Sequence, residues 1–251
     1  MKDIYVSENE SVDDLQLKGI QLIQKKGVFR FGVDAVLLAN YAVVRNNDSI
    51  IDLCSGTGIV PFILAGKTDA KHITGIEIMD DMVEMSNRSV KYNEMIGKIE
   101  FIQRDLKDIR FLKTFEKVDI VTVNPPYKLK NSGIVNNNNK NAIARHEICC
   151  ILEDVIVAAK VLLKSSGKLF MIHRPERLAD IFCAMRKYKI EPKRIRMVYS
   201  NYEKPPSMVL IEGVNNGGVF LKWDPPLYIY DMDGKYSDEI NKIYGRSETK
   251  N

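Results

Sequence analysis

The chain has 251 residues, of which 45% are hydrophobic and 28% are charged, and its formal net charge is +4. This balance predicts a globular protein with a sizeable core, and the mild positive charge permits a polyanionic partner without requiring one. No apolar run reaches the ~20 residues needed to cross a bilayer, and the N-terminal residues are too polar for a signal peptide. The four cysteines show no CxxC spacing, so we expect a cytoplasmic protein that uses neither a membrane nor a metal.

We expect residues 1–28, approximately, to form a short extension ahead of the main part of the domain. Residues 1–13 are polar, and we expect them to be loose. The apolar positions that recur from Leu15 to Phe31 indicate short strands or a hairpin. Asp34 then stands where it can cap a helix that continues to Tyr41. A loop that faces a ligand at this point is the alternative.

A buried strand, a glycine-containing turn and an apolar helix follow one another between residues 49 and 65. Ser49–Cys54 predicts the strand, Ser55-Gly56-Thr57-Gly58 the turn and Ile59–Ala65 the helix. This order is typical of the first unit of a Rossmann-like nucleotide-binding sheet. The third glycine of the dinucleotide pattern and the GK[ST] of a triphosphate site are both absent. The turn therefore lets a ligand approach the backbone closely without requiring a pyrophosphate.

Acidic residues stand at the ends of three consecutive predicted strands. Asp52 lies at the end of the first strand and suits a cationic ammonium group. Glu77 lies about 20 residues beyond the glycine turn, where an acid accepts hydrogen bonds from ribose hydroxyls. Asp105 follows the third strand, Ile99–Gln103, and suits an adenine amino group. Each acid alone could instead cap the next helix, but their regular placement favours one shared ligand.

A fourth strand, Val118–Val123, ends abruptly in Asn124-Pro125-Pro126-Tyr127. Since two prolines cannot continue a ladder, the sequence predicts a rigid elbow at a strand's carboxyl end, where open α/β sheets bind ligands. The Asn124 side-chain carbonyl and the Pro125 main-chain carbonyl can accept both hydrogens of a conjugated NH2 group. Tyr127 offers an aromatic face for stacking. The alternative is an ordinary Pro-Pro turn after a core strand.

The chain beyond the elbow contains two basic segments. Residues 128–145 predict a long loop that either clamps a substrate or is disordered. The cluster from Lys187 to Arg196 either contacts phosphates or is a solvated face. Periodicity predicts helices at 148–163 and 176–188, and strands at 168–173, 194–199 and 208–212. Strand-like pieces follow at Val219–Trp223 and Leu227–Tyr230. Neither a repeat nor a linker-like stretch occurs, so we expect residues 1–251 to form a single domain.

In this order, the glycine turn, the strand-end acids and the Asn-Pro-Pro-Tyr elbow resemble class I S-adenosylmethionine-dependent amino methyltransferases. The resemblance covers roughly residues 29–213. Residues 29–41 and Arg145-His146-Glu147 are similar to the bacterial tRNA(Val) adenine-N6 methyltransferase group in particular. The resemblance implies an α/β fold with a Rossmann-like, seven-stranded, mostly parallel sheet, one antiparallel strand at an edge and helices on both faces.

The resemblance also implies a cofactor, a partner and a set of site residues. The cofactor is S-adenosylmethionine and the partner is tRNA, with an adenosine next to the anticodon of a valine tRNA as the target. Contacts to the cofactor are implied for Asp52, Cys54, Ser55, Gly56, Gly58, Glu77, Asp105, Leu106 and Asn124. Catalytic roles are implied for Asn124, Pro125, Pro126 and Tyr127. Contacts to the substrate are implied for Tyr127, Lys128, Lys130 and Arg145.

Three other functions share parts of this pattern. Enzymes that methylate a glutamine amide in release factors use the same Asn-Pro-Pro-Tyr, but carry a helical N-terminal domain that this sequence does not show. DNA adenine methyltransferases usually add a large target-recognition region, for which we expect no room here. A module that binds the cofactor or RNA without transferring methyl groups is the third alternative, and an intact Asn124 and Tyr127 argue against it.

Overall fold

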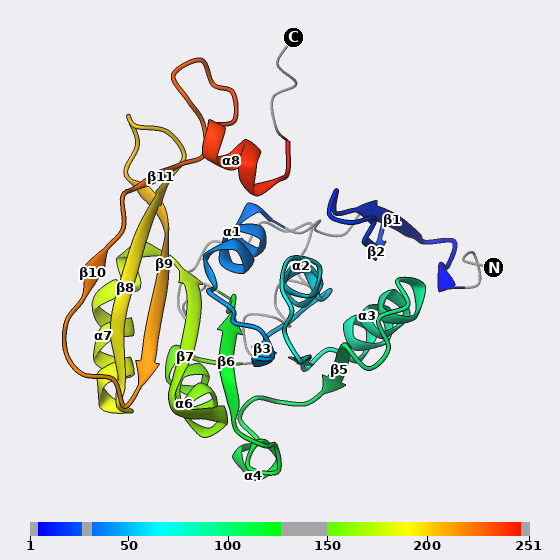
Figure 1. Ribbon diagram of the computed structural model, residues 1–251, viewed down its shortest axis with the longest axis horizontal. Helices are drawn as coiled ribbons and strands as arrows, with labels where there is room; N and C mark the ends of the chain where they lie inside the picture. Colours follow the sequence, from blue (N-terminus) through cyan, green and yellow to red (C-terminus); the bar gives the residue numbers. More distant parts are fainter. Residues whose placement is uncertain (1–4, 27–31, 127–149, 247–251) are drawn as a thin grey trace, which may run out of the picture.

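A computed structural model describes residues 5–26, 32–126 and 150–246 of the chain. A mostly parallel central sheet stands between helices, and β6 in Figure 1 points with its carboxyl end toward the top of the view. The order of strands across the sheet is β10-β8-β9-β7-β6-β3-β4-β5, and β11 also pairs with β8. The strands are β3 (Ser49–Leu53), β4 (His72–Glu77), β5 (Ile99–Gln103), β6 (Val118–Val123), β7 (Leu163–His173), β8 (Ile190–Tyr199), β9 (Pro206–Asn215), β10 (Lys222–Trp223) and β11 (Leu227–Tyr228).

Two hydrophobic clusters lie on opposite faces of the sheet, because successive strand residues point to opposite sides. Ile50 packs into one cluster and its neighbour Ile51 into the other. The first cluster includes α1 (Val33–Tyr41), α2 (Ile59–Lys67), α3 (Asp80–Tyr92) and α8 (Asp238–Ile243). The second includes α4 (Ile109–Leu112), α6 (Leu152–Leu162) and α7 (Leu178–Lys187), the last preceded by the short helix η2 (Pro175–Arg177). The expected α/β class, with helices on both faces of a Rossmann-like sheet, is confirmed.

The number of strands and the position of the antiparallel strand differ from expectation. The described sheet has nine strands, because β10 and β11 each add two residues in parallel to β8. The predicted strand-like pieces Val219–Trp223 and Leu227–Tyr230 contain these two strands, but the sequence does not show that both pair with β8. The antiparallel strand β9 lies between β7 and β8 and not at an edge.

The N-terminal segment is a hairpin that packs on the main body of the protein. β1 (Glu10–Asp14) and β2 (Gln21–Lys25) are antiparallel, so the expectation of a loose chain is wrong for residues 10–13. Leu22 is fully buried in the first cluster. The Ser89 hydroxyl on α3 accepts a hydrogen bond from the Ile23 N–H at 3.0 Å. The sequence does not predict this order, because the hairpin is held by its contacts with α3 and the first cluster and not by a periodic pattern of its own.

None of the helices in the described ranges is long and apolar enough to cross a membrane.

Candidate active site

The order in which the chain adds strands to the sheet reverses at β3. From β3 the chain adds β4 and β5 on one side, and then returns to place β6 against the other side of β3 (Figure 1). β3 and β6 are parallel, and Leu53 pairs with Val123 at their carboxyl ends. The turn at residues 54–58 and the elbow at 124–126 therefore follow two neighbouring strands, at the point where such sheets bind ligands.

The turn after β3 depends on left-handed backbone conformations. The φ angles are 56° at Cys54, 53° at Gly56 and 82° at Gly58. A Cβ on Gly58 would stand 2.4 Å from the ring of Phe101, so packing as well as conformation requires glycine there. A Cβ on Gly56 would meet no atom within 4 Å. The turn thus leaves open space beside its backbone at Gly56, as expected for close approach of a ligand. The Ser55 side chain, by contrast, is buried beneath the turn, near Gly75.

Asp52 is a buried acid between β3 and β6. It is 2% exposed, and its Oδ1 accepts a hydrogen bond of 2.5 Å from the Thr122 hydroxyl. Burial raises the pKa of Asp52 to about 8, against the opposing effect of the Thr122 hydroxyl and with help from the Glu77 charge. A cation bound next to Asp52 would favour its ionised form again. The position therefore suits the predicted ammonium group, and that contact stays a prediction.

Glu77 joins the end of β4 to the glycine turn. Its Oε2 accepts the N–H of Gly56 at 2.9 Å, and its Oε1 accepts those of Ile78 at 2.9 Å and Met79 at 3.1 Å. A carboxylate offers about four acceptor positions, so these three bonds leave capacity for a further donor such as a ribose hydroxyl. Glu77 is thus an organiser of the turn as well as the predicted ribose ligand.

Asp105 and Leu106 follow β5 and lie beyond Glu77 along the same edge of the sheet. Asp105 accepts the N–H of Lys107 at 2.9 Å, and its carboxylate is 3.4 Å from the Lys107 ammonium. Its side chain is 37% exposed, whereas Leu106 is buried in the second cluster. Asp105 is therefore accessible to a ligand, and its contact with adenine stays a prediction.

A second thiol stands beside Cys54. The side chain of Cys150, which precedes α6, interacts with Cys54, and this interaction together with burial raises the pKa of Cys54. The charge of Asp105 also acts on Cys150, so Cys150 belongs to the same edge of the sheet. No local pattern predicts this contact, because Cys54 and Cys150 are far apart in the chain and only the fold brings them together.

The elbow after β6 is tied to the first turn of α1. The Asn124 side-chain nitrogen Nδ2 donates a hydrogen bond of 3.0 Å to the Asp34 carboxylate. Asp34 does not cap α1, since the N-cap is Gly32 and makes no side-chain cap bond. It lies within the first turn and its carboxylate accepts the bond from Asn124, so the capping interpretation is wrong. The alternative, a ligand-facing loop just before Asp34, stays a prediction because residues 27–31 lie outside the described ranges. Tyr127, Lys128, Lys130 and Arg145 lie outside the described residues.

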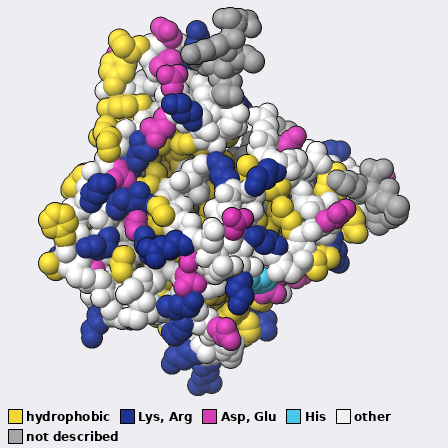
Figure 2. All heavy atoms as spheres, viewed as in Figure 1, with side chains coloured by type: hydrophobic (Ala, Val, Ile, Leu, Met, Phe, Trp, Pro, Cys, Tyr) yellow, Lys and Arg dark blue, Asp and Glu magenta, His cyan; other side chains and the backbone are white. Residues whose placement is uncertain are grey.

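The basic cluster at residues 187–196 is largely engaged in ion pairs within the chain. Acids or carbonyl groups neutralise or bind each of its arginines. The pairs are Lys187–Glu153 at 2.5 Å, Arg194–Glu212 at 2.8 Å, Arg194–Asp224 at 3.2 Å and Arg196–Glu239 at 2.6 Å. Figure 2 shows Lys and Arg side chains interspersed with Asp and Glu rather than gathered in one basic patch on this face. This favours the structural interpretation of the cluster over direct phosphate binding.

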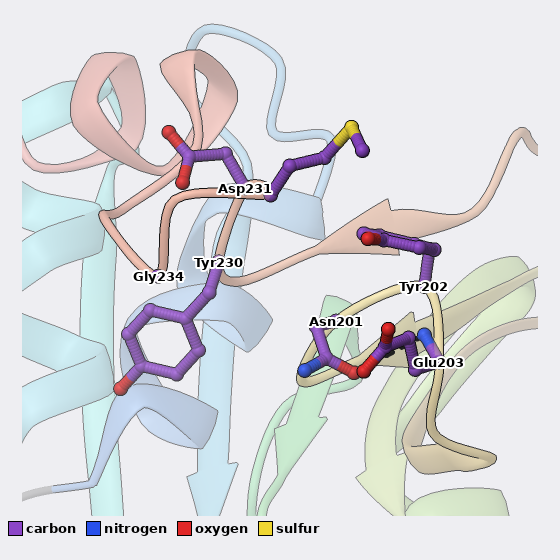
Figure 3. Close-up of a pocket in the computed structure, with 7 residues that line it drawn as sticks. Asn201, Tyr202, Glu203, Tyr230, Asp231 and Gly234 are labelled. Atoms are coloured by element: carbon purple, nitrogen blue, oxygen red, sulfur yellow. Dashed lines mark hydrogen bonds between the residues drawn. The ribbon is translucent and has the colours of Figure 1, made fainter.

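A shallow hollow lies between the loop after β8 and the loop after β11 (Figure 3). β8 is antiparallel to β9, β9 is antiparallel to β7, and β7 is parallel to β6, so β8 ends at the same edge of the sheet as the elbow. The hollow is lined by Asn201, Tyr202, Glu203, Tyr230, Asp231, Met232 and Gly234. Sequence reasoning did not identify it. Among the described residues, no group of three or more His, Cys, Asp or Glu side chains could hold a metal ion.

Comparison with known proteins identifies the family. The family model "Methyltransferase small domain" matches residues 19–187, which is more than half of the chain. The chain belongs to this family. The sheet described above is therefore a methyltransferase fold, and the resemblance drawn from the sequence is confirmed at this level.

Several curated relatives of this methyltransferase share one name. A tRNA1(Val) (adenine(37)-N6)-methyltransferase from Histophilus somni is 24% identical over 244 residues, which cover 92% of this chain and 94% of that protein. A protein of the same name from Porphyromonas gingivalis is 27% identical over 206 residues, or 80% of each chain. These matches also confirm the resemblance to the adenine-N6 group.

Solved structures agree on the fold. A predicted O-methyltransferase from Agrobacterium tumefaciens has a TM-score of 0.69 at 21% identity, covering 85% of this chain and 97% of that one. The protein SMU.776, crystallised with SAH, has a TM-score of 0.60 at 12% identity and covers 83% of this chain and 56% of its own.

Proposed function

We propose that this methyltransferase transfers a methyl group from S-adenosylmethionine to N6 of an adenosine in tRNA. The observation that carries the proposal is the place of the Asn124-Pro125-Pro126 elbow, directly beside the 54–58 turn at the switch point of the sheet. The names of the relatives support the finer proposal that the target is the adenosine next to the anticodon of a valine tRNA. A tRNA partner agrees with the cytoplasmic location that we expect from the cysteines.

The residues at this edge of the sheet fit S-adenosylmethionine. The open space at Gly56 admits a ligand against the backbone, and Glu77 has acceptor capacity beside it. Asp52 is a buried acid whose raised pKa would return toward normal beside an ammonium group. When bound, the cofactor supplies an electrophilic methyl group on a sulfonium.

The elbow prepares the target nitrogen for attack. The lone pair of an exocyclic amine is conjugated with its ring, so the amine is a weak nucleophile. When its two N–H groups donate to the Asn124 side-chain carbonyl and the Pro125 main-chain carbonyl, the nitrogen becomes pyramidal and its lone pair is freed. With the cofactor bound, this nitrogen would form the new N–C bond as the C–S bond breaks, and the surplus proton would then pass from the nitrogen to water. No general base is needed before transfer.

Nucleoside analysis tests the proposed function. The purified protein is incubated with unmodified tRNA and S-adenosylmethionine, and the digested nucleosides are analysed by mass spectrometry. We expect N6-methyladenosine, formed in tRNA and not in a free nucleoside mixture. Methyl transfer to a release-factor glutamine, or cofactor binding without transfer to either substrate, would contradict the proposal.

A further inference from the structure

Asn124 makes a directed hydrogen bond away from the site, and its partner is an acid. Its Nδ2 donates to Asp34 Oδ2 at 3.0 Å, across 90 residues of sequence. The other oxygen of the carboxylate, Asp34 Oδ1, accepts the N–H of Ala35 at 3.0 Å. Both oxygens of Asp34 are therefore engaged, which fixes the plane of the carboxylate.

Gly32 provides the space in which the Asp34 carboxylate stands. A Cβ at position 32 would lie 2.3 Å from Asp34 Oδ1, a separation that atoms do not adopt. A side chain at position 32 would displace the carboxylate from its place beside Asn124. The start of α1 is thus shaped around this one acid.

The two ends of a primary amide are chemically opposite, because the NH2 end only donates and the carbonyl end only accepts. A half-turn of the amide exchanges the two ends at almost no steric cost. A carboxylate next to the amide removes this ambiguity, since it accepts from the NH2 end and repels the carbonyl oxygen.

We propose that Asp34 is a positioning residue that fixes the amide of Asn124, so that its carbonyl oxygen is turned toward the target amine. The proposal rests on the proposed function, because only a substrate with N–H donors needs an acceptor at this point. The same bond polarises the amide and makes its carbonyl oxygen a stronger acceptor. Asp34 itself touches neither substrate nor cofactor in this proposal.

Substitution of Asp34 tests the proposal through kinetics. In D34A we expect kcat for tRNA methylation to fall about 10- to 100-fold, the range for partners that orient a functional group, while cofactor affinity in calorimetry stays unchanged. The matched control is D81A, which removes an acid from the same position in the first turn of α3, where it pairs with Lys25. D81A should keep the wild-type kcat.

A reversal of polarity separates orientation from a merely structural link. N124D alone places two carboxylates face to face and should be poorly active. In D34N/N124D the amide at position 34 can donate to the carboxylate at position 124, whose second oxygen still faces the amine. We expect this double variant to recover at least about tenfold in kcat over N124D. A double variant no better than N124D would overturn the proposal.

A measurement without substrate keeps this inference distinct from the proposed function. The side-chain NH2 signals of Asn124 in a nitrogen-15 NMR spectrum are assigned by their loss in N124A. We expect D34A, but not D81A, to shift these signals and to accelerate their hydrogen exchange. If wild-type protein fails to methylate tRNA while the NMR result holds, the proposed function fails and the orientation stands. If D34A retains wild-type kcat and unshifted signals, the orientation fails alone.

Discussion

At the scale of single residues, the candidate site contains two buried acids, and burial of a carboxylate costs free energy unless it has hydrogen-bond partners. Asp52 is buried with a hydroxyl partner, and Glu77 is buried with three backbone N–H donors. The two differ in consequence: Glu77 holds the turn together, whereas Asp52 has a raised pKa that a cation would relieve. Each therefore predicts a different result when it is changed.

The raised pKa of Asp52 predicts a pH dependence of cofactor binding. Burial raises the pKa of Asp52 from its ordinary value of 3.8 to about 8, so the ligand-free folded protein keeps a proton that the unfolded chain loses, and stability falls as pH rises between these values. Binding of an ammonium favours the ionised form, so the Kd for S-adenosylmethionine should fall by up to about tenfold per pH unit as pH approaches 8.

Calorimetry between pH 6 and 8, approximately, measures this dependence, with D52N as the reference, since it keeps the acceptor for Thr122 and cannot ionise. The ammonium of the cofactor titrates in both proteins and cancels from the comparison. Parallel curves for wild type and D52N would show that Asp52 is not the ammonium partner.

Glu77→Ala should weaken cofactor binding by about 1.5–3 kcal/mol, the scale of a hydrogen bond to a charged group. We also expect E77A to lower the free energy of unfolding, because three backbone N–H groups donate to Glu77 and alanine leaves them without this acceptor. Calorimetry on E77A and E77Q, with Tm recorded for both, separates the effects. Unchanged affinity in a folded E77A protein would rule out the ribose assignment.

At the scale of elements, the start of α1 and the N-terminal hairpin each contact a distant part of the chain. The first turn of α1 supplies Asp34 to the elbow after β6, and the β1–β2 hairpin covers α3. The hairpin is fixed by a bidentate ion pair in which Arg88 Nη1 and Nη2 donate to Glu10 at 2.6 Å each. Both side chains are mostly buried, at 6% and 18% exposure for Glu10 and Arg88.

This ion pair predicts that the hairpin loosens in acid. The Arg88 hydrogen bond lowers the pKa of Glu10 from 4.5 to about 2, so the stabilisation is present above pH 4.5 and is lost as pH falls toward 2. At neutral pH, Glu10→Gln should cost about 1.5–3 kcal/mol. Denaturant unfolding of the wild type and the Glu10→Gln variant between pH 4.5 and 2 measures the difference in unfolding free energy, which should narrow as pH falls. A constant difference would contradict the assignment.

At the scale of the whole molecule, the proposed binding of tRNA requires basic side chains that are available to phosphates. The ion pairs of Arg194 and Arg196 leave the cluster at 187–196 engaged within the chain, so phosphate contacts are expected from elsewhere. The segment at 128–145 follows the elbow directly in sequence and carries the basic residues proposed for substrate binding.

Salt dependence distinguishes the two basic segments. Alanine at Lys128, Lys130 or Arg145 should weaken tRNA binding and reduce the slope of log affinity against log salt by about 1 each. Arg196→Ala should instead lower Tm and leave this slope unchanged, because Arg196 pairs with Glu239. Filter binding at several salt concentrations measures both. An equal decrease in the salt slope for R196A would show that the cluster at 187–196 contacts RNA phosphates.

Local chemistry is enough to predict the fold class, the glycine turn, the strand-end acids and the elbow. Alternating apolar residues make strands, left-handed turns need glycine, and Pro-Pro ends a ladder. Three features lie beyond it: the pairing of β10 and β11 with β8, the docking of the N-terminal hairpin on α3, and the ion pairs of the basic cluster. These depend on which surfaces meet, and no local signal encodes that.

The role of Asp34 follows from the fold and not from its place in the sequence. From sequence it is an acid near the start of a helix, where capping is the common role. The fold instead brings it within 3.0 Å of Asn124, 90 residues away, and so changes its role from capping a helix to holding an amide. The physical reason is that a hydrogen bond depends on distance and direction in space, which the switch point between β3 and β6 sets and the order of residues does not.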